Sequence, residues 1–371
     1  MSALILLLLA DRQVRRDRSE LVHVVYVNGI RGKSTVTRMI DGGLRAGGWK
    51  VFCKTTGTVP MVIGVDGTAR PLVRRGRANI SEQVRVLHRA VREGAEILVI
   101  ECMAVDPALQ AVSQHRMVRA DIGVITNVRL DHTAEMGPTL EEICDSLSNT
   151  IPWNGTLFTA DGAFLDQLRT NGRRKNCRVE LAQPDSGLPD FDFPENVALA
   201  LAVCREIGVD RDRALEGILR YQPDPYALSL FRLPSGAAFV NAMSVNDPQS
   251  TQLDYHRVAG RPGMVGRRLV LLINNRPDRG YRTEHMMMVA RGLEPYPAAA
   301  VEQAVPASSQ AELSADQTKE EENEGQLPGA VPDPCCMGSD AEDMLDVLTG
   351  FIEEELENCR NYRMMAQQGP M

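Results

Sequence analysis

The residues with the clearest chemical meaning stand in the sequence VNGIRGKST, residues 27–35. Its glycines let a backbone approach an anion closely, its lysine can reach terminal phosphates, and its hydroxyls can ligate Mg²⁺ at the start of a helix. The strict Walker pattern would place its first glycine where this chain has Val27. The stretch therefore predicts a variant phosphate-binding loop. Its candidate contacts with a nucleotide are Asn28, Gly29, Gly32, Lys33, Ser34 and Thr35.

A short GK[ST] sequence often occurs by chance. The residues around it therefore decide whether it is interpreted as a phosphate-binding loop. The preceding run LVHVVYV is apolar and β-branched, which is typical of a buried strand that ends at a turn. A helix is expected from Lys33 onward. This order of strand, loop and helix lets backbone N–H groups face a bound phosphate.

Polar residues also follow two further apolar runs. Glu101 closes the run ILVIEC, and Asn127, Asp131 and His132 come after the run DIGVIT. The carboxyl ends of parallel strands meet at one edge of a sheet, so we expect these side chains near the phosphate loop. Glu101 would then ligate Mg²⁺. Taken singly, a helix-capping glutamate and a surface histidine remain the simpler alternatives.

Strand-like and helix-like segments alternate from Leu21 to about Gly208. The strand-like segments are LVHVVYV, ILVIEC, DIGVITNV and GTLFTA, and the helical ones include SEQVRVLHRAVREGA, TLEEICDSLSNTI and FPENVALALAVCREIGVD. This alternation predicts an α/β fold, with a doubly wound parallel sheet around the phosphate loop.

Composition divides the chain into five segments. A proline-containing joint, YQPDPYALS, precedes a second strand-rich stretch, and an acidic, Pro- and Ala-rich stretch with linker composition follows. The last segment opens with a capping box, Ser339 and Glu342, and has helical periodicity. The predicted segments are a hydrophobic and basic segment (1–20), a nucleotide-binding domain (21–225), an incomplete second α/β domain (226–292), an acidic disordered linker (293–338) and an amphipathic helix (339–371).

Charge and cysteine content exclude some classes of protein. The net charge is −8, but residues 291–371 hold 17 acids and 4 bases, leaving 32 acids and 37 bases before them. This small basic surplus suits phosphates and carboxylates and does not indicate a nucleic-acid binder. The eight cysteines include no CxxC pair, which favours free thiols in a reducing cytosol over disulfides or zinc.

The N-terminus combines a short apolar run, residues 3–10, with four following arginines. The run is shorter than the roughly 20 residues that span a bilayer. In a signal peptide the basic residues would come first. We therefore expect a cytoplasmic protein that is associated with the inner face of the cell membrane.

The motifs NGIRGKST, KTTGT, ECMAVDP and ITNVRLDHTAEMGPT, in this order, resemble the poly-gamma-glutamate synthase branch of the Mur-ligase superfamily. The resemblance continues through FPENVALALAV, FVNAMSVNDPQST and NNRPDRGYRT, and covers about residues 20–285. It implies an ATP-dependent amide ligase that activates a γ-carboxylate as an acyl phosphate for attack by the amine of glutamate. ATP and magnesium would be its cofactors. Its partners would be glutamate, poly-gamma-glutamate and membrane subunits of the synthase complex, with no nucleic acid and with homo-oligomerisation left open.

Carried over by position, the resemblance assigns roles to individual residues. The implied catalytic residues are Lys33, Glu101 and His132, and the implied metal ligands are Ser34, Glu101 and His132. The implied nucleotide contacts beyond the loop are Asn196, Asn246 and Asp247. A polyanionic substrate also needs cationic and hydrogen-bonding walls. The candidates are Lys54, Thr55, Thr56, Arg276, Arg279 and Arg282, for which an ordinary structural or solvated turn is the alternative.

The chain departs from the family pattern in two places. In PDPYALSLFRL, relatives would carry a glycine near Tyr226 and an arginine near Ser229, and Arg232 stands three residues later. The second domain also looks cut short after about Met288, as a gene fusion or a frame error would produce. Two alternatives therefore stay open: a truncated or chimeric ATP-binding chain without turnover, and a related folylpolyglutamate or muramyl-type ligase.

Overall fold

The computed structural model describes residues 2–57, 60–74, 78–185, 187–188, 193–223, 228–232, 236–242, 245, 247–267, 271–273, 280–293 and 299–300. The chain divides into two compact units. The first contains Met1–Ser229 and Asn241–Val258, and the second contains Leu230–Val240 and Ala259–Met371. The chain thus leaves the first unit close to the expected joint and returns to it for one further segment.

The first unit is built on an eight-stranded sheet in the order β4-β3-β2-β5-β1-β6-β7-β8. Its strands are β1 (His23–Asn28), β2 (Val51–Thr55), β3 (Met61–Ile63), β4 (Ala69–Pro71), β5 (Ile97–Glu101), β6 (Ile122–Ile125), β7 (Thr156–Thr159) and β8 (Arg178–Leu181). Neighbouring strands in the run β2-β5-β1-β6-β7-β8 pair in parallel. β3 pairs with β2, and β4 with β3, in antiparallel fashion. Because β5 and β6 flank β1 on opposite sides, the carboxyl end of β1 lies at the point where ligands bind in such sheets.

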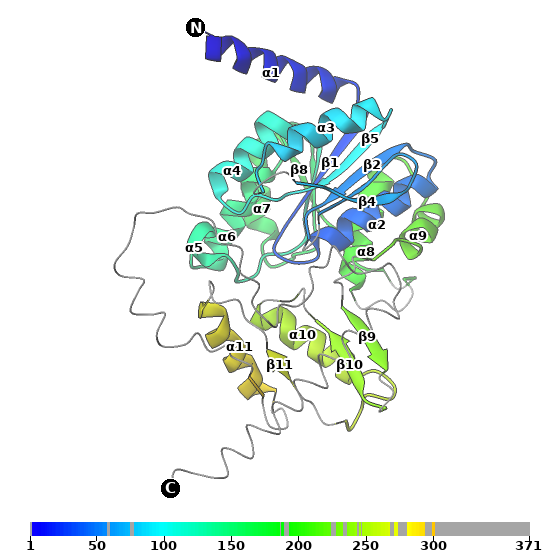
Figure 1. The fold of residues 1–371 in the computed structure, drawn as a ribbon, viewed down its shortest axis with the longest axis vertical. Coiled ribbons are helices and arrows are strands. Elements are labelled where there is room, and N and C mark those ends of the chain that lie inside the picture. The colour runs from blue at the N-terminus through cyan, green and yellow to red at the C-terminus, as the bar shows by residue number, and fades with distance from the viewer. Residues whose placement is uncertain are drawn as a thin grey trace, which may run out of the picture. The chain divides into compact units, whose positions relative to one another are not determined.

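Helices cover both faces of this sheet (Figure 1). They are α1 (Ser2–Ser19), α2 (Lys33–Ala46), α3 (Glu82–Arg92), α4 (Pro107–Val112), η1 (Ser113–Val118), α5 (Thr133–Met136), α6 (Leu140–Leu147), η2 (Ser148–Thr150), α7 (Leu165–Arg173), α8 (Pro194–Glu206) and α9 (Arg211–Leu219). The helix α10 (Pro248–Ala259) belongs to the first unit up to Val258. Val25 and Val27 of β1 pack with α2, α8 and α9, whereas Val24 and Tyr26 pack with α1 and α3. Burial of each such side chain stabilises the fold by roughly 1.5–3 kcal/mol.

The predicted α/β fold with a doubly wound, mostly parallel sheet is confirmed. The four predicted strands correspond to β1, β5, β6 and β7, and the predicted helices, including the one expected from Lys33 onward, to α2, α3, α6 and α8. The prediction missed β2, β3, β4 and β8. Three of them are short or partly exposed: β3 and β4 have three residues each, and no residue of β8 is fully buried. β2 is as long and as buried as β5, but it contains Lys54.

The predicted free thiols are confirmed for the part of the chain that the structure describes. The free cysteines there are Cys53, Cys102, Cys144, Cys177 and Cys204, all of them buried. Burial raises the pKa of Cys204 to about 12, so this thiol stays protonated at neutral pH.

The N-terminal helix α1 packs on the first unit through its second half. Val14 belongs to the core beneath α3, and the guanidinium of Arg18 donates to Asp121 over 2.8 Å and to the carbonyl of Arg119 over 2.9 Å. Among the described helices, none combines the length and apolar character that a membrane crossing requires. The predicted segment 1–20 is therefore largely one helix that is anchored to the sheet domain.

The described residues of the second unit form short elements. They are β9 (Ser229–Arg232), β10 (Ala238–Asn241), β11 (Leu272–Ile273), α11 (Gly280–Gly292) and β12 (Ala299–Ala300). β9 pairs with β10, and β11 pairs in parallel with β12. The predicted C-terminal helix, 339–371, lies outside the described residues, as does the predicted linker apart from residues 293, 299 and 300.

Candidate active site

The phosphate loop joins β1 to α2 and depends on two glycines. Gly29 has φ 127° and Gly32 has φ 79°, both in the region that side chains disfavour. A Cβ atom on Gly29 would lie 2.0 Å from the Oγ1 of Thr126. Gly32 is the N-cap of α2, and no described side chain caps this helix. Its first N–H groups and the positive end of its dipole are therefore free for an anion.

The ammonium of Lys33 lies over this loop. Its Nζ donates to the carbonyl oxygens of Gly29 and Ile30 over 2.8 and 3.2 Å. Burial lowers the pKa of Lys33, which means that the protein disfavours its charged form. Phosphate oxygens accept charge-assisted hydrogen bonds more strongly than neutral carbonyls do. Lys33 is therefore placed to exchange loop carbonyls for phosphate.

Ser34 and Glu101 form the centre of the site. The Oγ of Ser34 donates to Oε2 of Glu101 over 2.9 Å, and the N–H of Thr56 donates to the same oxygen over 2.7 Å. Glu101 is 2% exposed and pairs with Val27 of β1 in the sheet register. The carboxylate thus lies beside the loop, as the sequence predicts, and it is joined to the first turn of α2.

Thr55 provides a test of whether a divalent ion fits here. It is 1% exposed, and its Oγ1 is buried without a hydrogen-bond partner in the structure. By strand alternation it shares a face of β2 with Cys53, whose Sγ lies 3.9 Å from the carbonyl of Thr37 in α2. A buried hydroxyl without a partner costs about 1–3 kcal/mol, which a bound ion and its water would offset. The hydroxyls and the carboxylate are the hard oxygen donors that Mg²⁺ prefers.

No group of three or more His, Cys, Asp or Glu side chains forms a metal site by itself within the described residues. This agrees with Mg²⁺ chemistry, because proteins usually hold this ion through one or two carboxylates together with phosphate oxygens and water. The donors therefore fit a magnesium–nucleotide complex better than a free metal ion.

His132 approaches from the other side of β1. It follows β6, its φ is 53°, and its N–H donates to Oδ1 of Asp131 over 2.8 Å. The Nε2 of His132 lies 3.8 Å from Oδ2 of the same carboxylate. The structure thus joins Ser34 directly to Glu101, whereas it anchors His132 on Asp131 at the neighbouring strand end.

Two other predicted nucleotide contacts are buried near the loop. Asn196 lies in the first turn of α8, and its Oδ1 would be 3.1 Å from a Cβ on Gly32, so it packs on the N-cap of α2. Asn28 ends β1, and its Nδ2 donates to Gln110 and Thr150 over 3.1 and 3.2 Å. Asn28 therefore holds the end of the strand in place.

Lys54 is fully enclosed. Its side chain is 0% exposed, and Nζ forms an ion pair with Oε1 of Glu82 over 2.9 Å. Arg74 donates to the other oxygen of Glu82 over 2.7 Å. The neighbouring Gln83 donates to the backbone carbonyl of Glu101 over 3.0 Å. Lys54 thus belongs to the wall behind Glu101, while the N–H of Thr56 contacts Glu101 itself.

Several predicted site residues cannot be placed. Asn246, Arg276 and Arg279 lie outside the described residues, and Arg282 lies in α11, in a part whose side chains are not described. Asp247 precedes α10 and binds Arg31 of the loop over 2.6 Å.

Arg31 and its carboxylate partners were missed as a group by sequence reasoning. The only local signal was a basic residue between two loop glycines, and nothing in the sequence connects it with Asp247.

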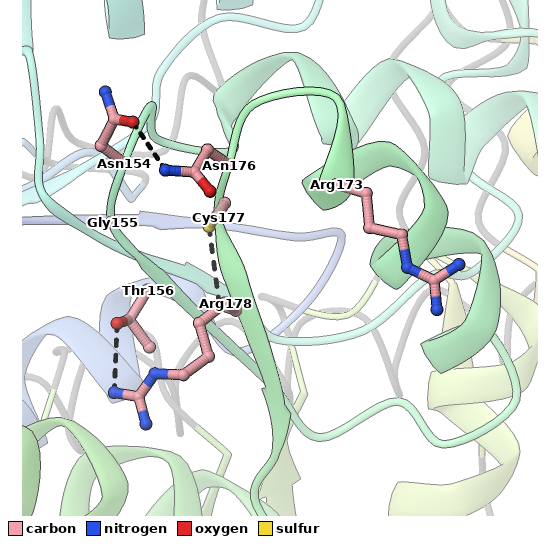
Figure 2. A pocket seen from close by; sticks show the side chains of 7 residues that line it. All are labelled: Asn154, Gly155, Thr156, Arg173, Asn176, Cys177 and Arg178. Carbon is pink, nitrogen blue, oxygen red and sulfur yellow. Dashed lines mark hydrogen bonds between the residues drawn. The ribbon is translucent and has the colours of Figure 1, made fainter.

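A described hollow lies away from these residues, at the amino ends of β7 and β8 (Figure 2). It measures about 430 Å³ and is lined by Asn154, Gly155, Thr156, Arg173, Asn176, Cys177 and Arg178. Asn176 donates to Asn154 over 2.9 Å, and Arg178 donates to Thr156 over 3.3 Å. No predicted site residue lines it.

Comparisons with known proteins identify the family of the chain. The model of the Mur ligase middle domain matches residues 27–180, and the model of the poly-gamma-glutamate synthase CapB C-terminal domain matches residues 232–312. The PGA synthase CapB of Bacillus subtilis (strain 168) is 37% identical over 293 residues, which cover 76% of this chain and 74% of the relative. This chain belongs to the CapB family.

Within the CapB family, the capsule biosynthesis protein CapB of Bacillus anthracis is 40% identical over 284 residues, or 73% of this chain. These residues span 60% of the length of that relative. The CapB C-terminal match ends at residue 312, beyond the domain end expected at residue 292.

Solved structures show the shared fold. Escherichia coli FolC in complex with DHPP and ADP is 15% identical, with a TM-score of 0.55 over 82% of this chain and 86% of that one. MurF from Acinetobacter baumannii is also 15% identical, with a TM-score of 0.59 over 81% of this chain and 67% of that one. The CapB-family chain therefore has the fold of Mur-type ligases.

Proposed function

We propose that this CapB-family chain is an ATP-dependent amide ligase that extends poly-gamma-glutamate. The observation that carries the proposal is the contact of Ser34 with Glu101 at the carboxyl end of β1, next to the uncapped N-terminus of α2. A loop that receives phosphates and an acid that receives a divalent ion are the parts that phosphoryl transfer needs. The PGA synthase annotation of a relative at 37% identity supports the choice of polymer.

Bound Mg²⁺-ATP supplies the γ-phosphoryl group that activates a carboxylate. The loop N–H groups and Lys33 hold the phosphate oxygens and neutralise the charge that develops during transfer. Ser34, Glu101 and His132 would hold the divalent ion. Asn196 and Asn246 would contact the nucleotide, and Asp247 would act next to the loop, where it already binds Arg31.

The carboxylate oxygen of the growing chain attacks the γ-phosphorus, and the bond to ADP breaks. The amine of an incoming glutamate then attacks the acyl carbon, phosphate leaves, and the nitrogen loses a proton. The amide forms without any oxidant or reductant. Arg276, Arg279 and Arg282 are the proposed carboxylate clamps, because a planar guanidinium binds a carboxylate with two parallel hydrogen bonds.

Lys54, Thr55 and Thr56 are proposed to shape the acceptor side of the site. The burial of Lys54 makes its effect indirect, through Glu82 and the adjacent Gln83. The N–H of Thr56, which already donates to Glu101, lies closer to the chemistry.

The proposal extends to the surroundings of the chain. We place it in the cytoplasm at the inner face of the membrane, together with membrane subunits of the synthase complex. Residues 3–10 of α1 are apolar and precede the arginines of that helix. Glutamate and the polymer are the proposed substrates, and self-association is compatible with this arrangement.

Acceptor-dependent release of ADP tests the proposed function. The purified full chain, with Mg²⁺-ATP, should release ADP and phosphate when glutamate and poly-gamma-glutamate are present, and not when folate or a muramyl peptide replaces them. Product length on a gel should rise in step with the ADP released. Nucleotide binding without glutamate-dependent turnover would contradict the ligase proposal, and turnover with folate or a muramyl peptide would contradict the substrate.

A further inference from the structure

Arg31 stands inside the phosphate loop, but its guanidinium is committed to two carboxylates. Its Nε donates to Oδ2 of Asp247 over 2.6 Å, and its Nη2 donates to Oδ2 of Asp131 over 2.8 Å. The carboxylate side chains are only 2% and 4% exposed, respectively. One arginine thus compensates two buried negative charges from distant parts of the chain.

The backbone of Arg31 is held as firmly as its side chain. Its N–H donates to Oδ1 of Asn127 over 3.0 Å. Its carbonyl accepts from Oγ1 of Thr126 over 2.6 Å and from Nδ2 of Asn127 over 3.1 Å. A displacement of the guanidinium is therefore transmitted to the loop backbone between Gly29 and Gly32.

Each carboxylate has a second task. Oδ1 of Asp247 accepts the N–H of Ser250 over 2.8 Å and so caps the first turn of α10. Oδ1 of Asp131 accepts the N–H of His132 over 2.8 Å. Arg31 therefore connects the phosphate loop with the proposed metal-binding histidine and with α10. At Ala259, the last residue of α10, the chain enters the second unit.

We infer that Arg31 is a positioning residue that couples the phosphate loop to the first turn of α10, so that nucleotide affinity depends on the Arg31–Asp247 ion pair. The inference rests on the proposed function only in taking the ligand of the loop to be a nucleotide. A planar guanidinium can serve two carboxylates at once, whereas a lysine ammonium is a single point charge. Residues in one such network act together, so their substitutions are not additive.

Two substitutions separate this coupling from simple loss of structure. Asp247→Asn removes the charge but leaves a side chain that caps helices equally well. Arg31→Lys keeps the positive charge but loses the planar guanidinium that donates to both carboxylates. Ser250→Ala is the matched control, because it removes the hydrogen bond that Arg129 donates to Ser250 Oγ and leaves the pair of Arg31 with Asp247 in place.

Calorimetric titration of the full chain with Mg²⁺ and a non-hydrolysable ATP analogue measures the coupling. Arg31→Lys and Asp247→Asn should each weaken binding about tenfold, and the double variant should bind no more weakly than the worse single variant. Ser250→Ala should stay within about twofold of wild type. Additive losses, or an equal loss in Ser250→Ala, would overturn the inference.

Hydrogen exchange in the protein without nucleotide gives an independent readout. Asp247→Asn should speed amide exchange in the peptide that covers residues 29–35, whereas Ser250→Ala should not. Unchanged exchange in Asp247→Asn overturns the coupling. If wild type binds no nucleotide, the proposed function fails, and the exchange result still decides whether Arg31 couples the loop to α10.

Discussion

The parallel strands of the central sheet have two ends, here called the amino edge, where the strands begin, and the carboxyl edge, where they finish. The polar groups at these two edges differ in how they are paired. At the amino edge, Asp121 accepts from Arg18 over 2.8 Å and from the N–H of Val24 over 2.7 Å, and it lies 2.6 Å from His23. Lys175 donates to backbone carbonyls at the end of η2, including that of Ser148 over 2.9 Å. Asp121 and Lys175 are thus paired, and of the neighbouring Arg119 the buried Nε has no partner in the structure, while its Nη2 donates to Asp11 over 2.8 Å.

At the carboxyl edge, several polar groups have hydrogen-bonding capacity that the described residues do not use. Among the described residues, no side chain caps α2, the hydroxyl of Thr55 has no partner, and Nζ of Lys33 donates to two neutral carbonyls. A folded protein keeps such groups where a ligand completes them, because unpaired buried polar atoms are costly. Unused pairing capacity therefore marks the phosphate loop, whereas the described hollow lies elsewhere.

Lys33→Ala should produce the largest effect on activity, and it tests the difference between the carboxyl and amino edges. We expect kcat for glutamate-dependent ADP release to fall about 10²–10³-fold, because a preorganised charge on the transferred phosphoryl group is lost. Thermal stability should not fall, since burial already disfavours the charged form of Lys33. Arg178→Ala at the amino edge is the control and should leave kcat unchanged. Wild-type turnover in Lys33→Ala would remove the distinction between the edges.

Gly29→Ala should destabilise the protein by about 3 kcal/mol in urea unfolding. The new Cβ would meet Thr126 Oγ1 at 2.0 Å and the Thr126 nitrogen at 2.8 Å, at a φ of 127°. Gly48→Ala is the matched control: its φ is also positive, at 93°, but nothing lies within 4 Å. The control should cost about 1 kcal/mol. Equal losses would show that backbone strain alone, and not the close approach of loop and β6, constrains Gly29.

Lys54→Met separates a structural lysine from one that binds acceptor. We expect a loss of about 2 kcal/mol in the free energy of unfolding, because Glu82 keeps only Arg74 as a partner. The KM for glutamate should change little in protein that remains folded. A large rise in this KM at unchanged stability would instead favour direct contact with the acceptor.

The pH dependence of His115 should give the smallest effect, and it should be confined to stability. Burial, together with the nearby Lys175 charge, lowers the pKa of His115 from 6.5 to about 4. Between these values the unfolded chain binds more protons than the folded protein. The contribution of neutral His115 to the free energy of unfolding is therefore complete above pH 6.5 and is lost as the pH falls towards 4. A shift of this size corresponds to at most about 3.4 kcal/mol, and because solvent screens the partly exposed His115, wild type should lose about 1 kcal/mol across this window relative to His115→Gln in urea unfolding. A parallel pH profile in both proteins would contradict the assignment.

The parts of the site that are local in the chain could be predicted from the sequence. Gly29, Lys33 and Ser34 belong to one turn, and Glu101 ends a strand whose neighbour is β1, so pattern and topology suffice. The Arg31–Asp247 contact could not be predicted, because it joins positions 216 residues apart. Lys54 was predicted to contact the substrate, with a structural turn as the alternative, and its burial could not be foreseen because it depends on Glu82, which α3 brings against the sheet.

The central claim is that Glu101 and Ser34 hold the divalent ion of a bound nucleotide. Paramagnetic resonance of Mn²⁺ in the presence of the full chain and a non-hydrolysable ATP analogue measures this binding directly. The account predicts that Glu101→Gln weakens Mn²⁺ binding at least about tenfold, whereas Glu206→Gln, an acid at the amino edge, does not. Mn²⁺ affinity at the wild-type level in Glu101→Gln would contradict it.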